Sequence, residues 1–215
     1  RGSTGLILAC ETGHLCAVKS ILEYSGSNHI DVNVQDSKGY SGFAWACFRG
    51  HTDIVKLMVN YAARKHIDLN LKNCRGRTGF MFACLLGRLK IVETLLDNPI
   101  IQINAKDKFR LTAFRLACYS GQVDVVKLLL GHPKTMSINL YESKIIIEHL
   151  LPCNNALLEA MHLDFAVNLN DGHTEIVTLL KKHEEYLSAK KDKKLAFSSS
   201  SVCNIKRPKI DKEKQ

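Results

Sequence analysis

Cysteines and histidines are the side chains of this 215-residue chain with the most distinctive chemistry, and it holds eight and nine of them. Thiolate and imidazole groups can bind zinc, paired thiols can form disulfides, and a histidine can act as a general base. Four cysteines recur at near-regular spacing, as Cys10, Cys47, Cys84 and Cys118. Histidine also recurs directly after glycine, for example as His14, His51 and His173. Both patterns have to be explained by the elements that carry these residues.

Those elements form an internal repeat. An apolar block with glycine as its last residue but one occurs four times, at residues 3–14, 40–51, 77–88 and 111–122. The shared glycines are Gly13, Gly50, Gly87 and Gly121, at successive spacings of 37, 37 and 34 residues. A short apolar block follows each copy, and then a stretch such as DVN, DLN, QIN or SIN. A fixed period of this length predicts a solenoid in which each unit buries its apolar face against its neighbours.

Each unit is predicted to contain two helices and a projecting loop. In the first block, apolar residues such as Phe80, Ala83 and Cys84 recur at helical spacing. The glycine that follows suits a helix C-cap, where the left-handed conformation is often required. The second block is a short helix with its charged positions facing water. The third block runs into Asp-, Asn- and Gly-rich stretches such as QDSKG and NCRGR, which predict an extended arm and a turn.

These features resemble the ankyrin family, whose units have a Gly-His pair between the helices and an Asp-Val-Asn close. Gly-His stands at residues 13–14, 50–51 and 172–173, and Asp-Val-Asn at residues 31–33. The start differs, since Gly5, Gly42, Gly79 or Ala113 replaces the family's proline. The resemblance implies an all-α repeat solenoid of about five stacked helix–turn–helix units with projecting β-hairpin-like loops.

The predicted repeat domain covers residues 1–182. Its units are residues 3–35, 40–72, 77–106, 111–141 and an irregular 142–182. The extra residues 142–160 are either a tolerated insertion or a partner-specific protrusion. Because the chain opens inside a repeat, we expect it to be a fragment of a longer protein. Residues 183–215 are predicted to be a basic, disordered tail; residues 181–215 hold eleven basic and five acidic residues, or +6 of the net charge of +9.

The repeat argues against catalysis, metal binding and a cofactor. Equivalent cysteines on stacked helices lie roughly 8–10 Å apart, which is too far for a disulfide or a shared zinc ion. We therefore expect buried, small apolar cysteines in a reducing intracellular compartment, cytoplasmic or nuclear. The Gly-His histidines are expected to hydrogen-bond neighbouring backbone. No small-molecule substrate is evident, and the longest apolar run, residues 80–86, is too short to cross a membrane.

The family resemblance implies that a partner binds the loop tips and the exposed side of the first helices. Twelve residues map to those positions: Lys38, Tyr40, Phe48, Arg49, Arg75, Arg77, Leu85, Leu86, Lys108, Phe109, Leu111 and Tyr119. Cations, aromatic and aliphatic groups dominate this set, and acid is scarce outside the first unit. We expect a protein partner with an acidic segment and a few apolar anchors. The alternative is a solvated rim with incidental aromatic residues.

Two other functions remain open from the sequence. The first is a nucleic-acid-associated nuclear factor, since a basic groove and tail attract phosphate. The second is the recognition arm of a larger enzyme, such as a kinase or a ubiquitin-ligase subunit. The tail also holds a candidate bipartite import signal made of Lys190, Lys191, Lys193, Lys194, Lys206, Arg207 and Lys209. A solubilising tail would have the same composition.

Overall fold

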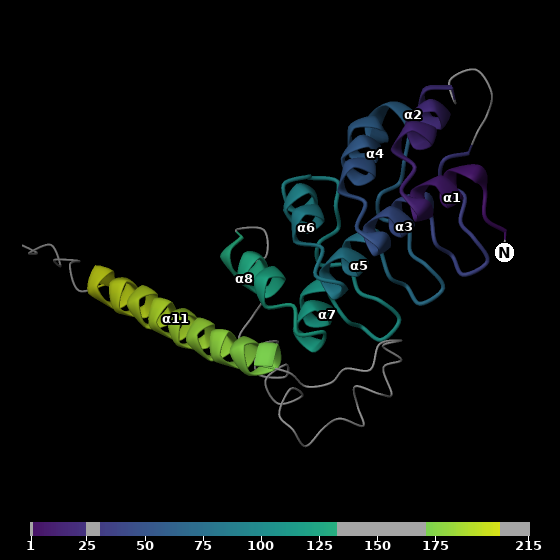
Figure 1. Cartoon of the computed structure of the whole chain (residues 1–215). Helices are drawn as coiled ribbons and strands as arrows, with labels where there is room; N and C mark the ends of the chain where they lie inside the picture. Colours follow the sequence, from purple (N-terminus) through teal and green to yellow (C-terminus); the bar gives the residue numbers. More distant parts are fainter. Residues whose placement is uncertain (1, 25–30, 133–170, 203–215) are drawn as a thin grey trace, which may run out of the picture.

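A computed structural model describes residues 2–24, 31–132 and 171–202 of the chain. The helices are α1 (Gly5–Thr12), α2 (Leu15–Tyr24), α3 (Gly42–Arg49), α4 (Thr52–Lys65), α5 (Gly79–Leu85), α6 (Leu89–Leu96), α7 (Ala113–Tyr119), α8 (Val123–Gly131) and α11 (Asp171–Val202). The first eight helices form four helix–turn–helix pairs that stack side by side (Figure 1). The described residues therefore have the all-helical repeat fold that the periodicity predicts.

A serine or threonine residue stands directly before the first helix of each pair and caps it. The side chains of Thr4, Ser41, Thr78 and Thr112 each accept a hydrogen bond from the backbone amide three residues later. This contact satisfies one of the amides that a helix start leaves without a partner. The glycine after the first helix is left-handed in every pair, with φ of 84° at Gly13 and 87° at Gly50. That confirms the predicted glycine-terminated turn.

Two layers of helices enclose the core. Helices α1, α3, α5 and α7 pack in one row, and α2, α4, α6 and α8 in a second row behind it (Figure 1). Two repeated positions lie wholly inside: Cys10, Cys47, Cys84 and Cys118, and Val18, Val55, Val92 and Val126, all 0% exposed. The cysteine ladder is thus a stripe of small apolar side chains in the core, as expected.

Glycine at the start of α3 and α5 permits close approach of the preceding pair. A Cβ added to Gly79 would lie 2.7 Å from Cε1 of Phe43, and one added to Gly42 would lie 3.1 Å from Sγ of Cys10. Real Cβ atoms almost never tolerate the first of these distances. The replacement of the family's proline is therefore explained at these two positions by packing between neighbouring units.

The loops between pairs project to one side and lie in a row (Figure 1). One side-chain oxygen of Asp36, Asn73 and Asp107 accepts two backbone amide hydrogen bonds in each loop. Neighbouring loops are joined by backbone bonds: the Cys74 amide donates to the Lys38 carbonyl, and the Lys108 amide to the Arg75 carbonyl, both at 3.0 Å. Among the described residues, the loops show one isolated antiparallel bridge, between Gln35 and Ser41.

Helix α11 packs its beginning against α7 and α8 and then extends away from the stack (Figure 1). Ile176 and Leu180 are buried, and Lys127 of α8 forms a 2.7 Å ion pair with Glu175. The predicted domain boundary at residue 182 falls inside this helix, which continues to Val202. Lysine, glutamate, leucine and alanine are good helix formers, so extending a started helix costs little. The 142–160 insertion and residues 203–215 lie outside the described residues.

Candidate partner-binding site

Four aromatic rings gather on the first-helix side of the second and third units. Tyr40 stacks against Trp45 with ring centroids 4.7 Å apart and against Phe82 at 5.1 Å. Phe48 meets Tyr40, Trp45 and Phe82 edge to face, with centroids at 5.5–6.2 Å. Offset and edge-to-face pairs of this kind are the preferred aromatic geometries. Tyr40, Trp45, Phe48 and Phe82 are the aromatic cluster; the first three are partly exposed.

The guanidinium of Arg49 lies over this cluster. Its Cζ is 5.4 Å from the Trp45 ring centroid and 5.8 Å from that of Phe48, which is cation–π range. The same side chain donates to the Glu11 carboxylate at 2.8 Å, and the two side chains are 47% and 26% exposed. Arg49 is therefore a solvent-accessible cation with a single, partly buried carboxylate as its partner in this contact.

Asp36 holds the indole of Trp45 in place. One of its carboxylate oxygens accepts a hydrogen bond from Nε1 of Trp45 at 3.0 Å, and the other accepts the loop amides. A pocket of about 250 Å³ opens beside this indole. It is lined by Ser3, Glu11, Asp36, Ser37, Lys38 and Trp45. Leu8 of α1 is 49% exposed. The indole of Trp45, the pocket beside it and Leu8 thus lie on the first two units.

Eight of the twelve predicted partner-binding residues are accessible. Lys38, Arg49, Lys108 and Phe109 are exposed, and Tyr40, Phe48, Arg75 and Leu86 are partly buried. Tyr40, Phe48 and Arg49 belong to or touch the aromatic cluster. Lys108 and Phe109 lie on the loop before α7, at the other end of the described row of loops.

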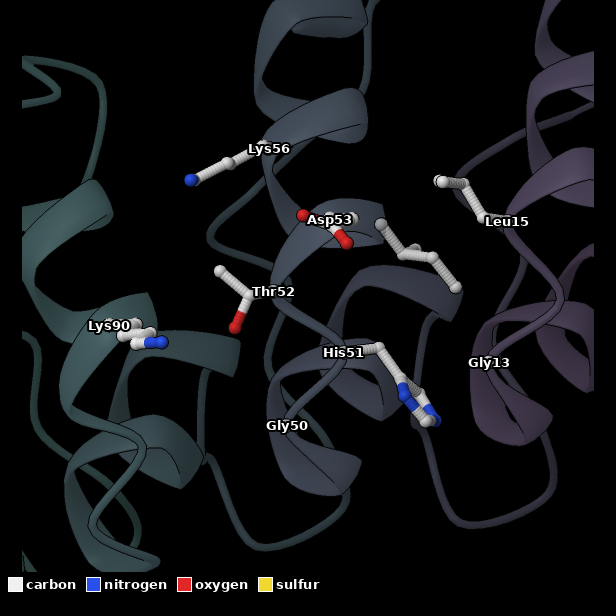
Figure 2. Close-up of a pocket in the computed structure, with 9 residues that line it drawn as sticks. Gly13, Leu15, Gly50, His51, Thr52, Asp53, Lys56 and Lys90 are labelled. Atoms are coloured by element: carbon white, nitrogen blue, oxygen red, sulfur yellow. The ribbon is translucent and has the colours of Figure 1, made fainter.

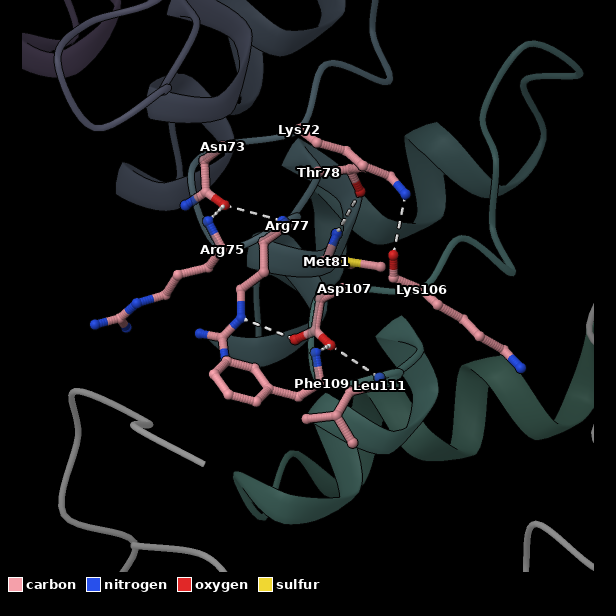
Figure 3. Close-up of polar contacts among 10 residues, drawn as sticks. All are labelled: Lys72, Asn73, Arg75, Arg77, Thr78, Met81, Lys106, Asp107, Phe109 and Leu111. Atoms are coloured by element: carbon pink, nitrogen blue, oxygen red, sulfur yellow. Dashed lines mark hydrogen bonds and ion pairs between the residues drawn. The ribbon is translucent and has the colours of Figure 1, made fainter. Parts of the chain in front are cut away.

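The other four predicted residues are core residues, and their assignment to an exposed surface was wrong. Arg77, Leu85, Leu111 and Tyr119 are 3%, 4%, 2% and 0% exposed. Arginine is almost never fully buried unless its charge is paired. Arg77 is accommodated because its Nε donates to Asp107 of the next loop at 3.3 Å, and that carboxylate is fully buried (Figure 3). Burial of a charge requires such a partner.

Sequence reasoning missed Trp45 and Leu8, which stand at the same position of the repeat. Both residues lie in the middle of a first helix, whereas the predicted surface positions lie in the loops and at the ends of these helices. A signal was available, because Trp45 is the single tryptophan of the chain and a bulky ring at a repeat position occupied elsewhere by leucine or phenylalanine. Asp36, which orients that ring, was also missed.

A second pocket of about 460 Å³ lies at the turn side of the first three units (Figure 2). Its charged residues are Asp53, Lys56 and Lys90, and it also contains His51. The His51 ring lies against Gly13, and its Nε2 is 3.1 Å from the Glu11 carbonyl oxygen. His173 makes the same kind of contact with the Tyr119 carbonyl at 3.0 Å, whereas His14 bonds the Thr12 hydroxyl. The predicted hydrogen bond to neighbouring backbone is therefore confirmed for His51 and His173, and it is wrong for His14.

The cysteine ladder has no nucleophilic character. Burial raises the pKa of the Cys10 thiol to about 12, and it also raises the pKa values of the Cys47, Cys84 and Cys118 thiols well above their usual range. The nucleophilic form of cysteine is the thiolate, which these groups do not reach at neutral pH. Within residues 2–24, 31–132 and 171–202, no three metal-ligating side chains cluster together.

Over the described ranges, no helix is both long and apolar enough to cross a membrane. No curated protein matches the chain. The family model for ankyrin repeats, in three copies, matches residues 6–107 and 64–142. Ankyrin repeats generally serve as protein–protein interaction modules and typically lack catalytic activity. With more than half of its length matched and its helix pairs stacked in one register, the chain belongs to the ankyrin repeat family.

Proposed function

We propose that this chain is a non-enzymatic binding module that holds an acidic, apolar-anchored segment of a partner protein on its first two units. The observation that carries the proposal is Arg49, a solvent-accessible cation set over Trp45 and Phe48. Aromatic residues and arginine are the side chains most often found at the energetic centre of protein interfaces. In this chain both kinds of side chain are present in one contact, that of Arg49 with Trp45 and Phe48.

The apolar groups of the site, Trp45 and Leu8, favour a partner that inserts an apolar side chain. The indole of Trp45 forms one wall of the 250 Å³ pocket, and its orientation is fixed by Asp36. Leu8 is half-exposed on the neighbouring first helix. Covering these groups removes apolar surface from water, at about 25 cal/mol per Å². A leucine- or phenylalanine-sized side chain of the partner suits a pocket of this volume.

The charged groups of the site, Lys38 and Arg49, favour a partner that carries a carboxylate. Lys38 and Arg49 are both exposed next to the cluster, and the Asp36 carboxylate already accepts hydrogen bonds from Trp45 and two amides. Glu11 occupies one side of the Arg49 guanidinium. A partner carboxylate that replaces Glu11 would retain the charge-assisted bond and add contacts with the aromatic cluster. Glu11 therefore competes with the partner for Arg49.

Binding can be measured directly, because Trp45 is the chain's single tryptophan. Peptides selected from a random displayed library on the native chain would be titrated while the fluorescence of Trp45 is recorded. We expect acidic peptides with one or two large apolar residues. Arg49→Gln should weaken their affinity about tenfold or more, since a hydrogen bond to a charged group is lost. Glu11→Gln should strengthen it, because the competing carboxylate is removed.

The opposite responses of these two variants distinguish the site from general electrostatic attraction. Lys56→Gln removes one positive charge from the exposed side of α4 and should leave the affinity unchanged. Equal weakening by Lys56→Gln and Arg49→Gln, or weakening by Glu11→Gln, would contradict the proposal. Titration with a DNA duplex tests the nucleic-acid alternative, for which a steep dependence of affinity on salt is expected.

A further inference from the structure

The loops that precede the first helices of the third and fourth units carry many cations and few acids. Residues 71–78 and 105–112 hold six basic side chains and one acidic side chain, that of Asp107. Asp107 is fully buried in an ion pair, so no exposed carboxylate lies within these two segments. Lys108 and Arg110 are exposed, and their side chains have no ion-pair or hydrogen-bond partner among the described residues. This edge of the molecule is therefore a positively charged surface.

The backbone brings the tips of these two loops into direct contact. The Lys108 amide donates to the Arg75 carbonyl at 3.0 Å, and a Cβ added to Gly76 would lie 2.9 Å from the Lys108 nitrogen. The side chains of Arg75 and Lys108 thus start from neighbouring points of the backbone. Like charges held close together repel one another, and an anion that lies across them relieves this repulsion.

Arg110 has a backbone conformation that is unfavourable for a residue with a side chain. Its φ is 60°, at the position where Gly39 and Gly76 have a φ of 77°. Its amide donates to the Asp107 carbonyl at 3.0 Å, and the two glycines make the same turn in their own loops. The turn therefore does not require arginine, and a Cβ in the left-handed region lies close to its own chain. Backbone strain of this kind is concentrated at functional sites.

Phe109 is an aromatic ring exposed between these two cations. It is 41% exposed, whereas Lys38 and Arg75 occupy the same position in the two earlier loops. The amides of Phe109 and Leu111 both donate to one carboxylate oxygen of Asp107 at 2.9 Å, which fixes the backbone on either side of the ring (Figure 3). A ligand that covers the ring would remove its apolar surface from water.

We propose that Arg75, Lys108, Phe109 and Arg110, called the loop-tip patch below, bind single-stranded nucleic acid. The three cations contact phosphates, and a base stacks on the Phe109 ring. Proteins that bind single strands combine cations along the phosphate backbone with exposed aromatic rings in this way. This patch is separate from the surface of the proposed function, which uses Arg49 and the pocket beside Trp45.

The exposed ring favours a single strand over two other anionic ligands. In a duplex each base is already stacked between its neighbours, so the ring has no free base face to cover. An acidic protein segment would anchor an apolar side chain in a pocket, such as the one beside Trp45. Phe109 is instead itself the exposed apolar group, and its face suits a flat base.

Binding can be measured by the fluorescence anisotropy of a labelled oligothymidylate about 15 nucleotides long, titrated with the 215-residue chain. We expect binding at low salt and a loss of affinity as salt is added, because phosphate contacts release counterions. A duplex of the same length serves as the second probe. Absence of oligothymidylate binding at low salt would overturn the proposal.

Two substitutions test the two kinds of contact separately. Arg110→Gly introduces the residue that Gly39 and Gly76 provide in the other loops, so the melting temperature should stay the same or rise. The affinity for the oligothymidylate should fall, and the slope of log affinity against log salt should become shallower by about 0.7, the value for one phosphate contact in a single strand. Phe109→Leu keeps an apolar side chain without the ring. It should weaken single-strand binding about tenfold and leave duplex binding unchanged.

Two further variants separate the patch from general electrostatic attraction and from the proposed function. Lys90→Gln removes one exposed charge from the turn side of the third unit and should change neither the affinity nor the slope. Arg49→Gln should also leave oligothymidylate binding unchanged, so the two proposals can fail independently. Equal weakening by Lys90→Gln and Arg110→Gly would overturn the proposal. Tighter binding of poly-glutamate than of the oligothymidylate would also overturn it, with an acidic protein as the occupant.

Cross-linking distinguishes the patch from the basic residues 181–215, which attract nucleic acid through charge alone. After ultraviolet irradiation of the complex, peptide mass spectrometry should find the oligothymidylate attached to the peptide that contains Phe109. This cross-link should be lost in Phe109→Leu. Cross-links confined to residues 181–215 would contradict the proposal, because the C-terminal part and not the loop-tip patch would then hold the strand.

Discussion

At the scale of single residues, the ion pair between Arg77 and Asp107 joins two loops inside the protein. Arg77 is 3% exposed, and its Nη2 is buried without a hydrogen-bond acceptor among the described residues (Figure 3). The desolvation of both charges is offset by one contact at 3.3 Å and by the amides that Asp107 accepts. Removing one partner of such a pair is much more costly than replacing both.

Asp107→Asn isolates the charge of this pair. Asparagine keeps an oxygen for the amides of Phe109 and Leu111, as Asn73 does at the equivalent position of the preceding loop. The Arg77 cation would remain buried without its carboxylate, so we expect the free energy of unfolding to fall by about 3–5 kcal/mol in urea titrations. The double variant Arg77→Met with Asp107→Asn should recover part of that loss. A cost below about 1 kcal/mol for the single variant would show that water reaches Arg77.

The cysteines provide a prediction about reactivity and pH. Burial holds the pKa of Cys10 at about 12 and raises the pKa values of Cys47, Cys84 and Cys118, whereas Cys16 and Cys74 are exposed. A thiol becomes nucleophilic only as the pH approaches its pKa. At pH 8, maleimide labelling followed by peptide mass spectrometry should therefore modify Cys16 and Cys74 and spare the four ladder cysteines. In urea, all six should react. Labelling of Cys47 in the folded chain would indicate local opening of α3.

At the scale of the elements, two glycines at the same repeat position should respond oppositely to alanine. Gly79→Ala places a Cβ 2.7 Å from Phe43, and crowding of this kind costs about 1–3 kcal/mol. Gly5→Ala meets open space at the start of α1 and should stabilise the chain by about 0.5–1 kcal/mol. Urea unfolding of both variants gives the comparison. A similar cost for the two would mean that a backbone requirement, and not packing, selects glycine here.

The elements themselves were predictable from the sequence because they depend on local signals. The spacing of Phe80, Ala83 and Cys84 predicted a helix, and Gly50 predicted its left-handed end; both are confirmed. The role of Gly79 was not predictable, since it depends on the distance to Phe43 in another unit. The sequence shows that glycine replaces the family's proline, whereas the packing role of this glycine is visible only in the stack.

At the scale of the whole molecule, periodicity identifies equivalent positions but not their exposure. Phe48, Leu85 and Tyr119 occupy one repeat position, yet Phe48 is partly exposed and the other two are buried. The sequence therefore predicted one surface over the second to fourth units. In the structure that surface is interrupted by buried residues, and the pocket beside Trp45 lies on the first two units. Exposure depends on everything packed around a position, and a single unit does not contain that information.

The basic C-terminal part gives the last prediction. Lys190, Lys191, Lys193 and Lys194 lie within α11, whereas Lys206, Arg207 and Lys209 lie outside the described residues. If the two clusters act together as an import signal, replacing the four α11 lysines with glutamine should abolish nuclear accumulation of a fluorescent fusion. The same change at Lys181 and Lys182, also in α11, provides the matched control. The buried Ile176 and Leu180 keep the helix docked in every variant.

An unchanged melting temperature would show that the stack is intact. A distribution identical to that of the unmodified fusion would leave the lysines with a solubilising role, because the same charges raise solubility without any receptor.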